Sequence, residues 1–322
     1  MKEVIRLKKR RKIRWSRVLL LIVFLIALLI GVVWLGKNIA VIVQGIQLKY
    51  SELVAEQKLH SKFQDEKFKQ YANILFFGLD DGDLDQTNSG KRADTVFLIS
   101  INKQTGQINI LSIPATAQIN IIGKKDQTDI SKAYYYGGAQ LAVRSIENFL
   151  EVPIHHYIAL DWHSFEKLVN EMGGINLYVE KDMQYMDPTV NLSINLKQGY
   201  QHLNGLETAH YAMFCKDELG EVGRVKRQQK LIKVMLDEFI KIDTIVKLPK
   251  VIELINQHIT TSLSMYDVAT LAKYINSSSP ENLNMEMLGG NNIVAQNKEI
   301  WAVDKEKVNG QMEKMFINKN IE

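Results

Sequence analysis

Cysteine is nearly absent from this chain, because only Cys215 among the 322 residues carries a thiol. An intramolecular disulfide is therefore impossible, which argues against a small secreted module held together by a cysteine framework. Cys215 follows Ala212, Met213 and Phe214 in a predicted helix, where a cysteine acts as a small buried hydrophobe. The sequence also contains no internal repeat and no low-complexity segment.

Several motifs with a defined chemistry are missing as well. The chain has no Walker-type phosphate loop, no G-x-G-x-x-G and no G-x-S-x-G nucleophile elbow. Its seven histidines are scattered without zinc-type spacing, and His155, His156 and His163 are interpreted as surface or strand residues. The sequence therefore gives no support to a P-loop enzyme, a serine hydrolase of the elbow type or a zinc enzyme.

Positive charge is concentrated at the start of the chain. Residues 1–17 contain nine lysine or arginine residues and one glutamate, a local net charge of +8. Since the whole chain carries +4, residues 18–322 carry −4 and the folded part is mildly acidic. A nucleic-acid-binding protein should carry its basic patch on the domain itself, so this distribution argues against nucleic acid as a partner.

One long hydrophobic run follows the basic tail. Val18 to Gly36 is uncharged and long enough to cross a bilayer as a single helix. A cleaved signal peptide would have a shorter apolar core and a small-residue cleavage site, whereas Lys37 and Asn38 lead into further apolar sequence. By the positive-inside rule, residues 1–17 form a cytoplasmic tail. We therefore expect a single-pass cell-membrane protein with an extracytoplasmic body, and the scarcity of cysteine fits a bacterial surface protein.

The remaining chain divides by composition. Residues 37–70 are polar and helix-prone, which indicates a stalk. Residues 71–245 alternate strand and helix patterns and predict an α/β layered domain. Residues 246–322 carry weaker signals and either complete the same domain or form a small appendage. Strands are predicted at 73–80, 95–101, 107–113, 156–160 and 175–179, and helices at 140–150, 162–172 and from 205.

The stretch Gly223 to Gln229 is predicted to begin a helix whose first turn is rich in cations. Apolar residues recur downstream at helical spacing, and the same stripe runs backwards through Gln228 and Arg224. Polar groups on a buried stripe need partners. Two partners fit: an anion bound by arginine and by the free N–H groups of a helix N-terminus, or a salt bridge to an acidic residue of the domain.

Acidic residues follow or begin predicted strands. Asp80 and Asp81 end the first strand, and Asp94 precedes the second. Two carboxylates on adjacent strands suit Mg²⁺, which prefers oxygen ligands and leaves positions for water and phosphate. The alternative is that each aspartate caps a turn.

Taken in order, a series of short motifs resembles the LytR-CpsA-Psr family of Gram-positive bacteria over roughly residues 72–240. The order of the series is more specific than any one motif. The motifs are ILFFGLD (74–80), KRADT (91–95), LSIP (111–114), KAY (132–134) with Gly137 and Gly138, GGI (173–175), LNG (203–205) and Gly223-Arg224 with RQQ (227–229).

The resemblance implies a membrane-anchored transferase with an α-β-α layered fold, built on a mixed central sheet and preceded by one transmembrane helix. Such proteins move teichoic acid, capsule or related glycopolymers from a polyprenyl-pyrophosphate carrier to peptidoglycan, with the prenyl chain in a hydrophobic pocket and Mg²⁺ at the pyrophosphate. The implied roles are metal binding by Asp80 and Asp94, catalysis by Asp94 and Arg92, and phosphate binding by Arg92, Arg224, Arg227 and Gln228.

The chain departs from the family pattern at three arginine positions. The expected Ser-Ile-Pro-Arg-Asp reads Ser-Ile-Pro-Ala115-Thr116, and the two arginines of Tyr-x-Arg-x-Arg are Met213 and Cys215. Each charge-assisted contact is worth roughly 1.5–3 kcal/mol, so the loss of three arginines should weaken pyrophosphate binding strongly. Lys216, one residue past the usual position, could compensate for one lost arginine. The alternative is therefore a catalytically weakened or inactive relative that acts as a polyprenyl-phosphate-binding or regulatory envelope protein. A transcriptional attenuator is poorly supported, because only residues 1–17 are cytoplasmic.

Overall fold

The computed structural model describes residues 66–80, 90–188, 192–241, 259–276, 282–295 and 298–316. The predicted cytoplasmic tail, the transmembrane run 18–36, most of the stalk and Asp81 lie outside these ranges. Within them, no helix combines the length and the apolar character needed to cross a bilayer. The described residues all belong to one compact unit.

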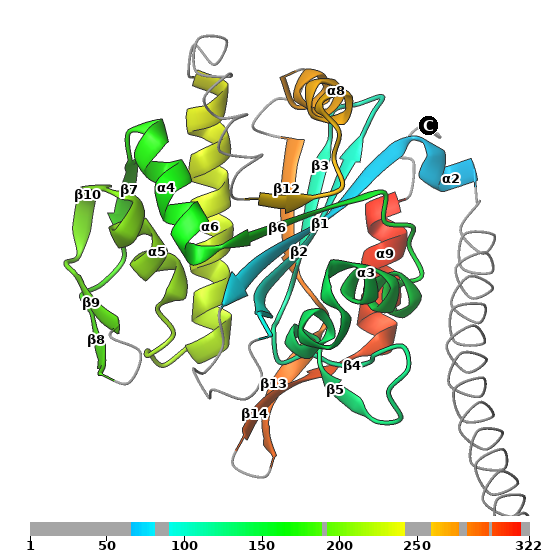
Figure 1. Ribbon diagram of the computed structural model, residues 1–322, viewed down its shortest axis with the longest axis horizontal. Coiled ribbons are helices and arrows are strands. Elements are labelled where there is room, and N and C mark those ends of the chain that lie inside the picture. Colours follow the sequence, from blue (N-terminus) through cyan, green and yellow to red (C-terminus); the bar gives the residue numbers. More distant parts are fainter. Residues whose placement is uncertain are drawn as a thin grey trace, which may run out of the picture. The chain divides into compact units, whose positions relative to one another are not determined.

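A six-stranded mixed sheet forms the centre of this unit, in the order β11-β6-β1-β2-β3-β12 (Figure 1). Strands β1, β2 and β3 pair antiparallel, whereas β6 runs parallel to β1 and β12 parallel to β3. The predicted α/β fold with a mixed central sheet is thus confirmed. The strands are β1 (Tyr71–Asp80), β2 (Arg92–Asn102), β3 (Ile108–Ile113), β6 (His156–Asp161), β11 (Ile259–Thr261) and β12 (Leu283–Met287).

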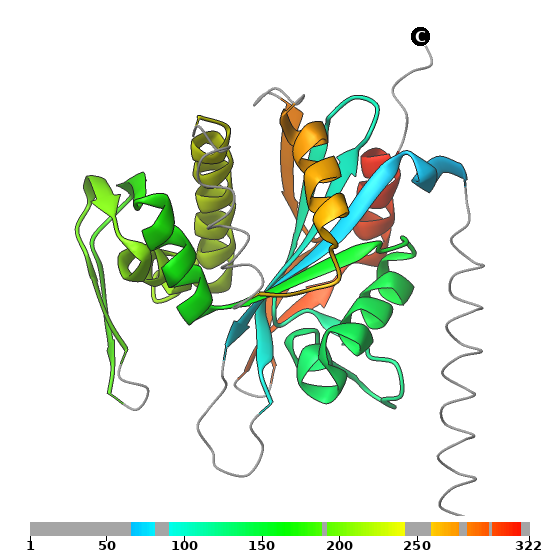
Figure 2. The same cartoon turned by 45° about the horizontal axis from the view of Figure 1, so that its top comes forward.

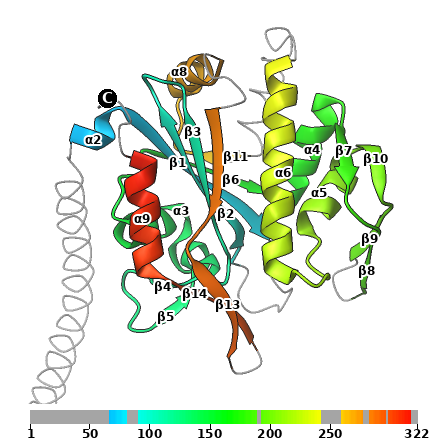
Figure 3. The same ribbon diagram turned by 180° about the vertical axis from the view of Figure 1, so that it is seen from behind.

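Helices cover both faces of the sheet, which explains why β1 is apolar at almost every position. Leu75, Phe77 and Leu79 point into the core cluster under α3 (Ser131–Leu150) and α9 (Lys305–Phe316). The alternate residues Ile74 and Phe76 belong to the cluster on the other face. That face carries α6 (Gly220–Lys241) and α8 (Met265–Asn276), so the arrangement is α-β-α (Figures 1 and 3).

A smaller lobe packs beside α6 and has its own apolar cluster (Figure 2). The lobe begins directly after β6, so the central sheet fixes the position at which the first helix of the lobe starts. Its core contains Val169, Ile175 and Tyr211, all fully buried. The lobe consists of α4 (Trp162–Met172), β7 (Ile175–Val179), β8 (Met183–Asp187), β9 (Leu192–Leu196), β10 (Gly199–Leu203) and α5 (Gly205–Met213).

The C-terminal region belongs to the central sheet and its core. Strand β12 extends the sheet beyond β3, and Val308, Met312 and Phe316 of α9 are buried in the cluster that lies under α3. The described residues 283–295 and 298–316 therefore complete the same domain. The remaining elements are α2 (Glu66–Lys69), β4 (Gln118–Asn120), β5 (Gln127–Asp129), β13 (Gly290–Ala295) and β14 (Lys298–Val303).

Two helix starts differ from the sequence-based expectation. Helix α3 begins at Ser131 rather than at Gln140, with a break at Gly137 and Gly138, where Gly138 has a φ of 64°. Helix α6 begins at Gly220, one turn before the predicted start at Gly223. Its extra turn is stabilised by Asp217, whose carboxylate accepts hydrogen bonds from the N–H groups of Leu219 and Gly220. The helix predicted near residues 251–255 lies outside the described residues.

Candidate functional site

An irregularity in the β1–β2 ladder places Asp94. Gly78 pairs with Thr95 and Leu79 pairs with Ala93, so Asp94 is the extra residue of a β-bulge. Bulges increase the local twist and redirect side chains, and they are frequent beside active sites. The next pair in the ladder joins Asp80 to Arg92. Two carboxylates and one guanidinium of the predicted site therefore come from one end of two neighbouring strands.

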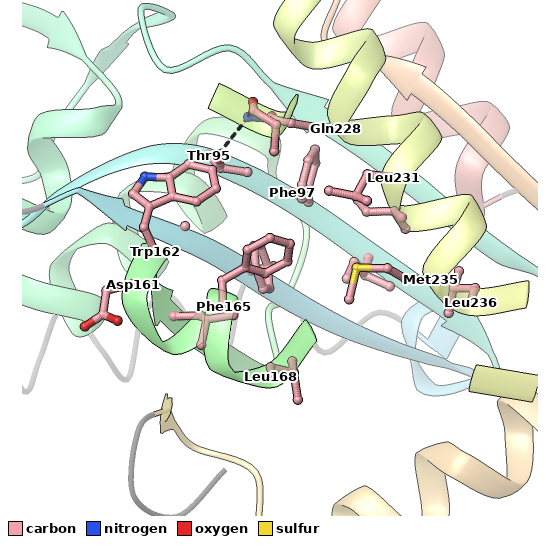
Figure 4. Close-up of a pocket in the computed structure, with 16 residues that line it drawn as sticks. Thr95, Phe97, Asp161, Trp162, Phe165, Leu168, Gln228, Leu231, Met235 and Leu236 are labelled. Atoms are coloured by element: carbon pink, nitrogen blue, oxygen red, sulfur yellow. Dashed lines mark hydrogen bonds between the residues drawn. The ribbon is translucent and has the colours of Figure 1, made fainter. Parts of the chain in front are cut away.

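Helix α6 brings two more predicted residues to this bulge. Arg224 donates a hydrogen bond from Nη2 to the backbone carbonyl of Asp94, at 3.1 Å. One turn later, Gln228 donates from Nε2 to Thr95 Oγ1 at 3.0 Å (Figure 4). Because residues four apart share a helix face, both side chains reach β2 together. The prediction that Arg224 and Gln228 lie on an inward stripe is confirmed.

Within the part of the chain that the structure describes, Arg224 and Arg92 each retain a buried donor without a partner. Arg224 forms an ion pair with Glu221 at 2.7 Å, and the two side chains are 15% and 12% exposed. Burial opposes the charge of Arg224, but Glu221 outweighs it and the arginine pKa is raised. Arg92 donates to Ser131 Oγ at 3.3 Å. The Nε atoms of both arginines are buried and unpaired among the described residues. Unmet buried donors are costly, and phosphate oxygens would satisfy them.

Arg227 has a different environment. Its Nη1 atom pairs with Asp217 at 2.7 Å, and its Nε and Nη2 atoms donate to the carbonyl of Phe214 at 3.1 and 2.6 Å. The Arg227 and Asp217 side chains are only 7% and 3% exposed. For Arg227, the salt bridge to an acidic residue is therefore the arrangement that the structure shows, and it joins α6 to the segment after α5.

The three positions without arginine differ in burial, because Met213 and Cys215 are partly exposed whereas Ala115 is not. Ala115 is buried and its carbonyl accepts a hydrogen bond from the N–H of Ser131. Met213 and Cys215 flank Phe214, whose carbonyl is bonded to a buried guanidinium. The ammonium of Lys216 lies 5.3 Å from the centre of the Tyr185 ring, a cation–π contact in the smaller lobe.

An apolar cavity of about 310 Å³ lies between the sheet and the helices beside it (Figure 4). Its walls come from β1, β2, β6, α4, α5 and α6, and its polar side chains are those of Thr95, Asp161 and Gln228. Ligand sites of this kind are mostly apolar with a few polar groups that fix orientation. The apolar lining comprises Phe76, Phe97, Ile99, Leu160, Trp162, Phe165, Leu168, Leu231, Ile232, Met235 and Leu236, with Gly78 and Ala212.

Asp161 is a rim residue that the sequence did not single out. Its Oδ2 atom pairs with Lys91 at 2.8 Å, and its Oδ1 atom accepts from the N–H of Ser164 and caps α4. Burial raises the carboxyl pKa, but the bonds from Lys91 and Ser164 outweigh burial and hold the pKa at about 2. The local signal was an aspartate three residues before a serine at a helix start. Nothing local indicated Lys91, which lies 70 positions earlier.

Replacing Asp161 with asparagine should lower stability by about 2 kcal/mol at neutral pH. The folded-state pKa lies below the ordinary 3.8, so the carboxylate stabilises the fold above pH 3.8 and loses this effect as pH falls towards 2. When denaturant unfolding is measured between pH 6 and pH 2.5, the difference in free energy of unfolding between the wild type and the variant should shrink as the pH falls. The exposed Asp126→Asn variant is the matched control. A constant difference at every pH would contradict the assigned cause.

Gly78 is required where β1 passes the bulge. A Cβ atom there would lie 2.8 Å from Thr95 Cβ and 3.2 Å from Thr95 Oγ1, the acceptor of the Gln228 bond. We expect Gly78→Ala to destabilise the fold by about 1–3 kcal/mol, measured by denaturant unfolding. Gly310→Ala in α9, where a Cβ would meet nothing within 4 Å, should be neutral or stabilising. Equal effects of the two variants would refute the steric explanation.

Comparison with known proteins decides the family. A family model described as the LytR_cpsA_psr family matches residues 41–317. The chain belongs to the LytR-CpsA-Psr family. The match includes β12 and α9, so the C-terminal elements are part of the family fold.

Among LytR-CpsA-Psr relatives, the chain is 27% identical over 281 residues to the polyisoprenyl-teichoic acid–peptidoglycan teichoic acid transferase TagV of Bacillus subtilis, covering 85% of this chain and 71% of TagV. The crystal structure of B. subtilis TagV superposes with a TM-score of 0.66 at 25% identity, covering 77% and 98% of the two chains.

Two further relatives support the assignment. The chain is 27% identical over 205 residues to the transferase TagU of Enterococcus faecalis, covering 63% of this chain and 65% of TagU. A structure of TagT bound to LIIa-WTA shares the fold, with a TM-score of 0.65 at 22% identity and coverage of 79% and 93%. The chain therefore spans about two thirds of the length of the TagV and TagU proteins it matches.

Proposed function

We propose that this chain is a membrane-anchored transferase that moves a glycopolymer from a polyprenyl-pyrophosphate carrier to peptidoglycan. One observation carries the proposal: the apolar cavity reaches Gly78 and Thr95 at the bulge of β2. There Asp80 and Asp94 share one end of the strands with two arginines whose Nε donors are unpaired among the described residues. A polyprenyl pyrophosphate joins a long hydrocarbon chain to a diphosphate, so its two parts match the two parts of the site. The names of TagV and TagU describe the same class of reaction.

The proposed membrane topology follows from the sequence. Residues 1–17 stay in the cytoplasm, Val18 to Gly36 cross the bilayer, and the folded body lies outside. A donor whose lipid chain is embedded in the same membrane would be within reach of such a body. The transmembrane anchor would therefore hold the protein and the donor lipid in the plane of the same membrane.

Mg²⁺ fits the donor set at the bulge. Asp80 and Asp94 offer hard oxygen ligands, and Mg²⁺ usually takes one or two carboxylates while water and substrate phosphates fill its other positions. The described residues contain no cluster of three or more His, Cys, Asp or Glu side chains suited to a metal, so an all-protein cage is not the arrangement proposed. Bound there, Mg²⁺ would offset charge on the diphosphate.

The protein side chains position the reacting groups. Arg92 and Arg224 bind diphosphate oxygens through their free Nε–H groups, and Gln228 fixes Thr95 beside the bulge. An acceptor hydroxyl attacks the phosphorus that carries the sugar, and a new P–O bond forms while the bridging P–O bond breaks. The hydroxyl proton passes to solvent, and polyprenyl monophosphate leaves. Such catalysis depends mainly on position and charge compensation.

A polyprenyl-phosphate-binding protein without transfer activity is the second candidate. It is favoured by Ala115, Met213 and Cys215, which occupy positions where the family pattern has arginine. It is also compatible with the apolar cavity, since lipid binding needs the cavity and not the complete anion site. The two candidates differ only in turnover.

The test uses the full chain in detergent micelles with Mg²⁺, a polyprenyl-pyrophosphate-linked glycan carrying a fluorescent label, and purified peptidoglycan. If the protein is a transferase, the label should become covalently bound to peptidoglycan, and omission of Mg²⁺ should prevent this labelling. If the lipid binds to the protein but no label reaches peptidoglycan under any of these conditions, the protein binds polyprenyl phosphate without transferring the glycan.

A further inference from the structure

A second cavity, of about 580 Å³, lies on the other face of the central sheet. It is open to solvent and bordered by the β4–β5 hairpin, the end of α3, β14 and the first half of α9, which lie close together in Figures 1 and 3. Ile119 and Val308 form part of its lining and belong to the core cluster under α3 and α9. It shares no lining residue with the apolar cavity, and its volume is within the range of about 300–1,000 Å³ typical of ligand sites.

Carboxamide side chains dominate the polar lining of this cavity. They are Gln118 and Gln127 on the hairpin, Asn120 between them, Asn148 on α3 and Asn309 on α9. Gln118 is bonded to neighbouring groups of the protein. The other four are exposed, and none of their side chains has a hydrogen-bond partner within the described part of the chain. Four donor and acceptor pairs from four elements are therefore available to a ligand.

The charge in the cavity is balanced. One cation, Lys305, and one anion, Glu151, complete the polar lining. The aromatic ring of Phe149 and the side chain of Ile300 add apolar surface. A lining with one positive and one negative charge offers little net electrostatic attraction to a polyanion such as a phosphate-linked polymer, whose binding needs an excess of cations.

We propose that this cavity binds a neutral glycan chain that carries N-acetyl groups. Each carboxamide both donates and accepts a hydrogen bond, as do sugar hydroxyls and acetamido groups. Apolar C–H faces of sugar rings pack on aromatic and aliphatic side chains such as Phe149 and Ile300. The site is distinct from the proposed transfer site and needs neither the donor lipid nor Mg²⁺, so it can be tested independently of transfer.

The experiment measures binding of the β-1,4-linked pentamer of N-acetylglucosamine to the full chain in detergent micelles, by isothermal titration calorimetry without donor or metal. We expect a Kd of roughly 0.1–1 mM for the wild type. The double variant Asn148→Ala/Asn309→Ala should weaken binding at least about tenfold, because it removes two of the four free carboxamides. Alanine suits these exposed helical positions, and thermal melting checks the fold.

Three comparisons make the result decisive. Asn195→Ala, an exposed carboxamide on β9 in the smaller lobe, should bind the pentamer as the wild type does. Arg224→Met should also leave pentamer binding unchanged, and any binding of an oligomer of glycerol phosphate should be unaffected by the double variant. The proposal is overturned if the pentamer fails to bind at about 10 mM, if Arg224→Met weakens it as much as the double variant does, or if the double variant affects only the glycerol phosphate oligomer.

Discussion

Asp94→Asn should reduce glycopolymer transfer by about a thousandfold while leaving the fold intact. The reduction is expected because the Asp94 carboxylate at the bulge is close enough to Arg224 to favour its charge, at the same end of the strands as Arg92. Asparagine has the same shape and keeps the backbone carbonyl that accepts the Arg224 hydrogen bond. The rate of appearance of polyprenyl monophosphate, followed by chromatography of extracted lipid, measures the effect.

The control for Asp94→Asn is again Asp126→Asn, which removes one carboxylate from an exposed turn. It should retain the wild-type rate. Binding of the donor lipid to the Asp94 variant should persist, because the apolar cavity does not include that side chain. An Asp94 variant that transfers glycan at the wild-type rate would remove Asp94 from the proposed mechanism.

Arg227→Met should lower the free energy of unfolding by about 3 kcal/mol. The substitution leaves Asp217 buried without its main cation and deprives the Phe214 carbonyl of two donors. Lys181, 3.6 Å from Asp217, offsets only part of this because it is more exposed. Urea unfolding followed by circular dichroism measures the loss.

The double variant Arg227→Met/Asp217→Leu separates the ion pair from the packing. Removing both charges should recover part of the stability, because the unpaired carboxylate is the main cost of the single variant. Below its melting temperature, the Arg227→Met variant should still bind the donor lipid and transfer the glycopolymer. The Arg224→Met variant should fold but lose glycopolymer transfer. A large loss of lipid headgroup binding in Arg227→Met with unchanged stability would instead restore the phosphate-binding role for this arginine.

The regular elements could be predicted because their causes are local. The apolar run that ends at Asp80 predicts β1, and both faces of that strand are indeed covered. Helix α4 matches its predicted range of 162–172 because the glycine pair that follows ends it: Gly173 adopts a φ of 93°. The ordered motifs identified the family, and the resemblance predicted the apolar cavity that the structure contains. The site roles of Asp94, Arg224 and Gln228 stay predictions.

Other features depend on contacts between distant segments and leave no local signal. The bulge at Asp94 is a property of the register between β1 and β2, not of β2 alone. The start of α6 was placed one turn late because the capping carboxylate of Asp217 lies in the preceding loop. The pairing of Arg227 with the same carboxylate could not be distinguished from an anion site by spacing alone.

The most direct test of the proposed transferase is the fate of the donor's diphosphate, followed by phosphorus NMR on the full chain with Mg²⁺, lipid-linked glycan and peptidoglycan fragments. If the protein is a transferase, the two diphosphate signals should decay together and be replaced by a monophosphate signal from the lipid and a phosphodiester signal from the product. A diphosphate spectrum that shifts on binding and then stays constant would contradict transfer and identify a lipid-binding protein.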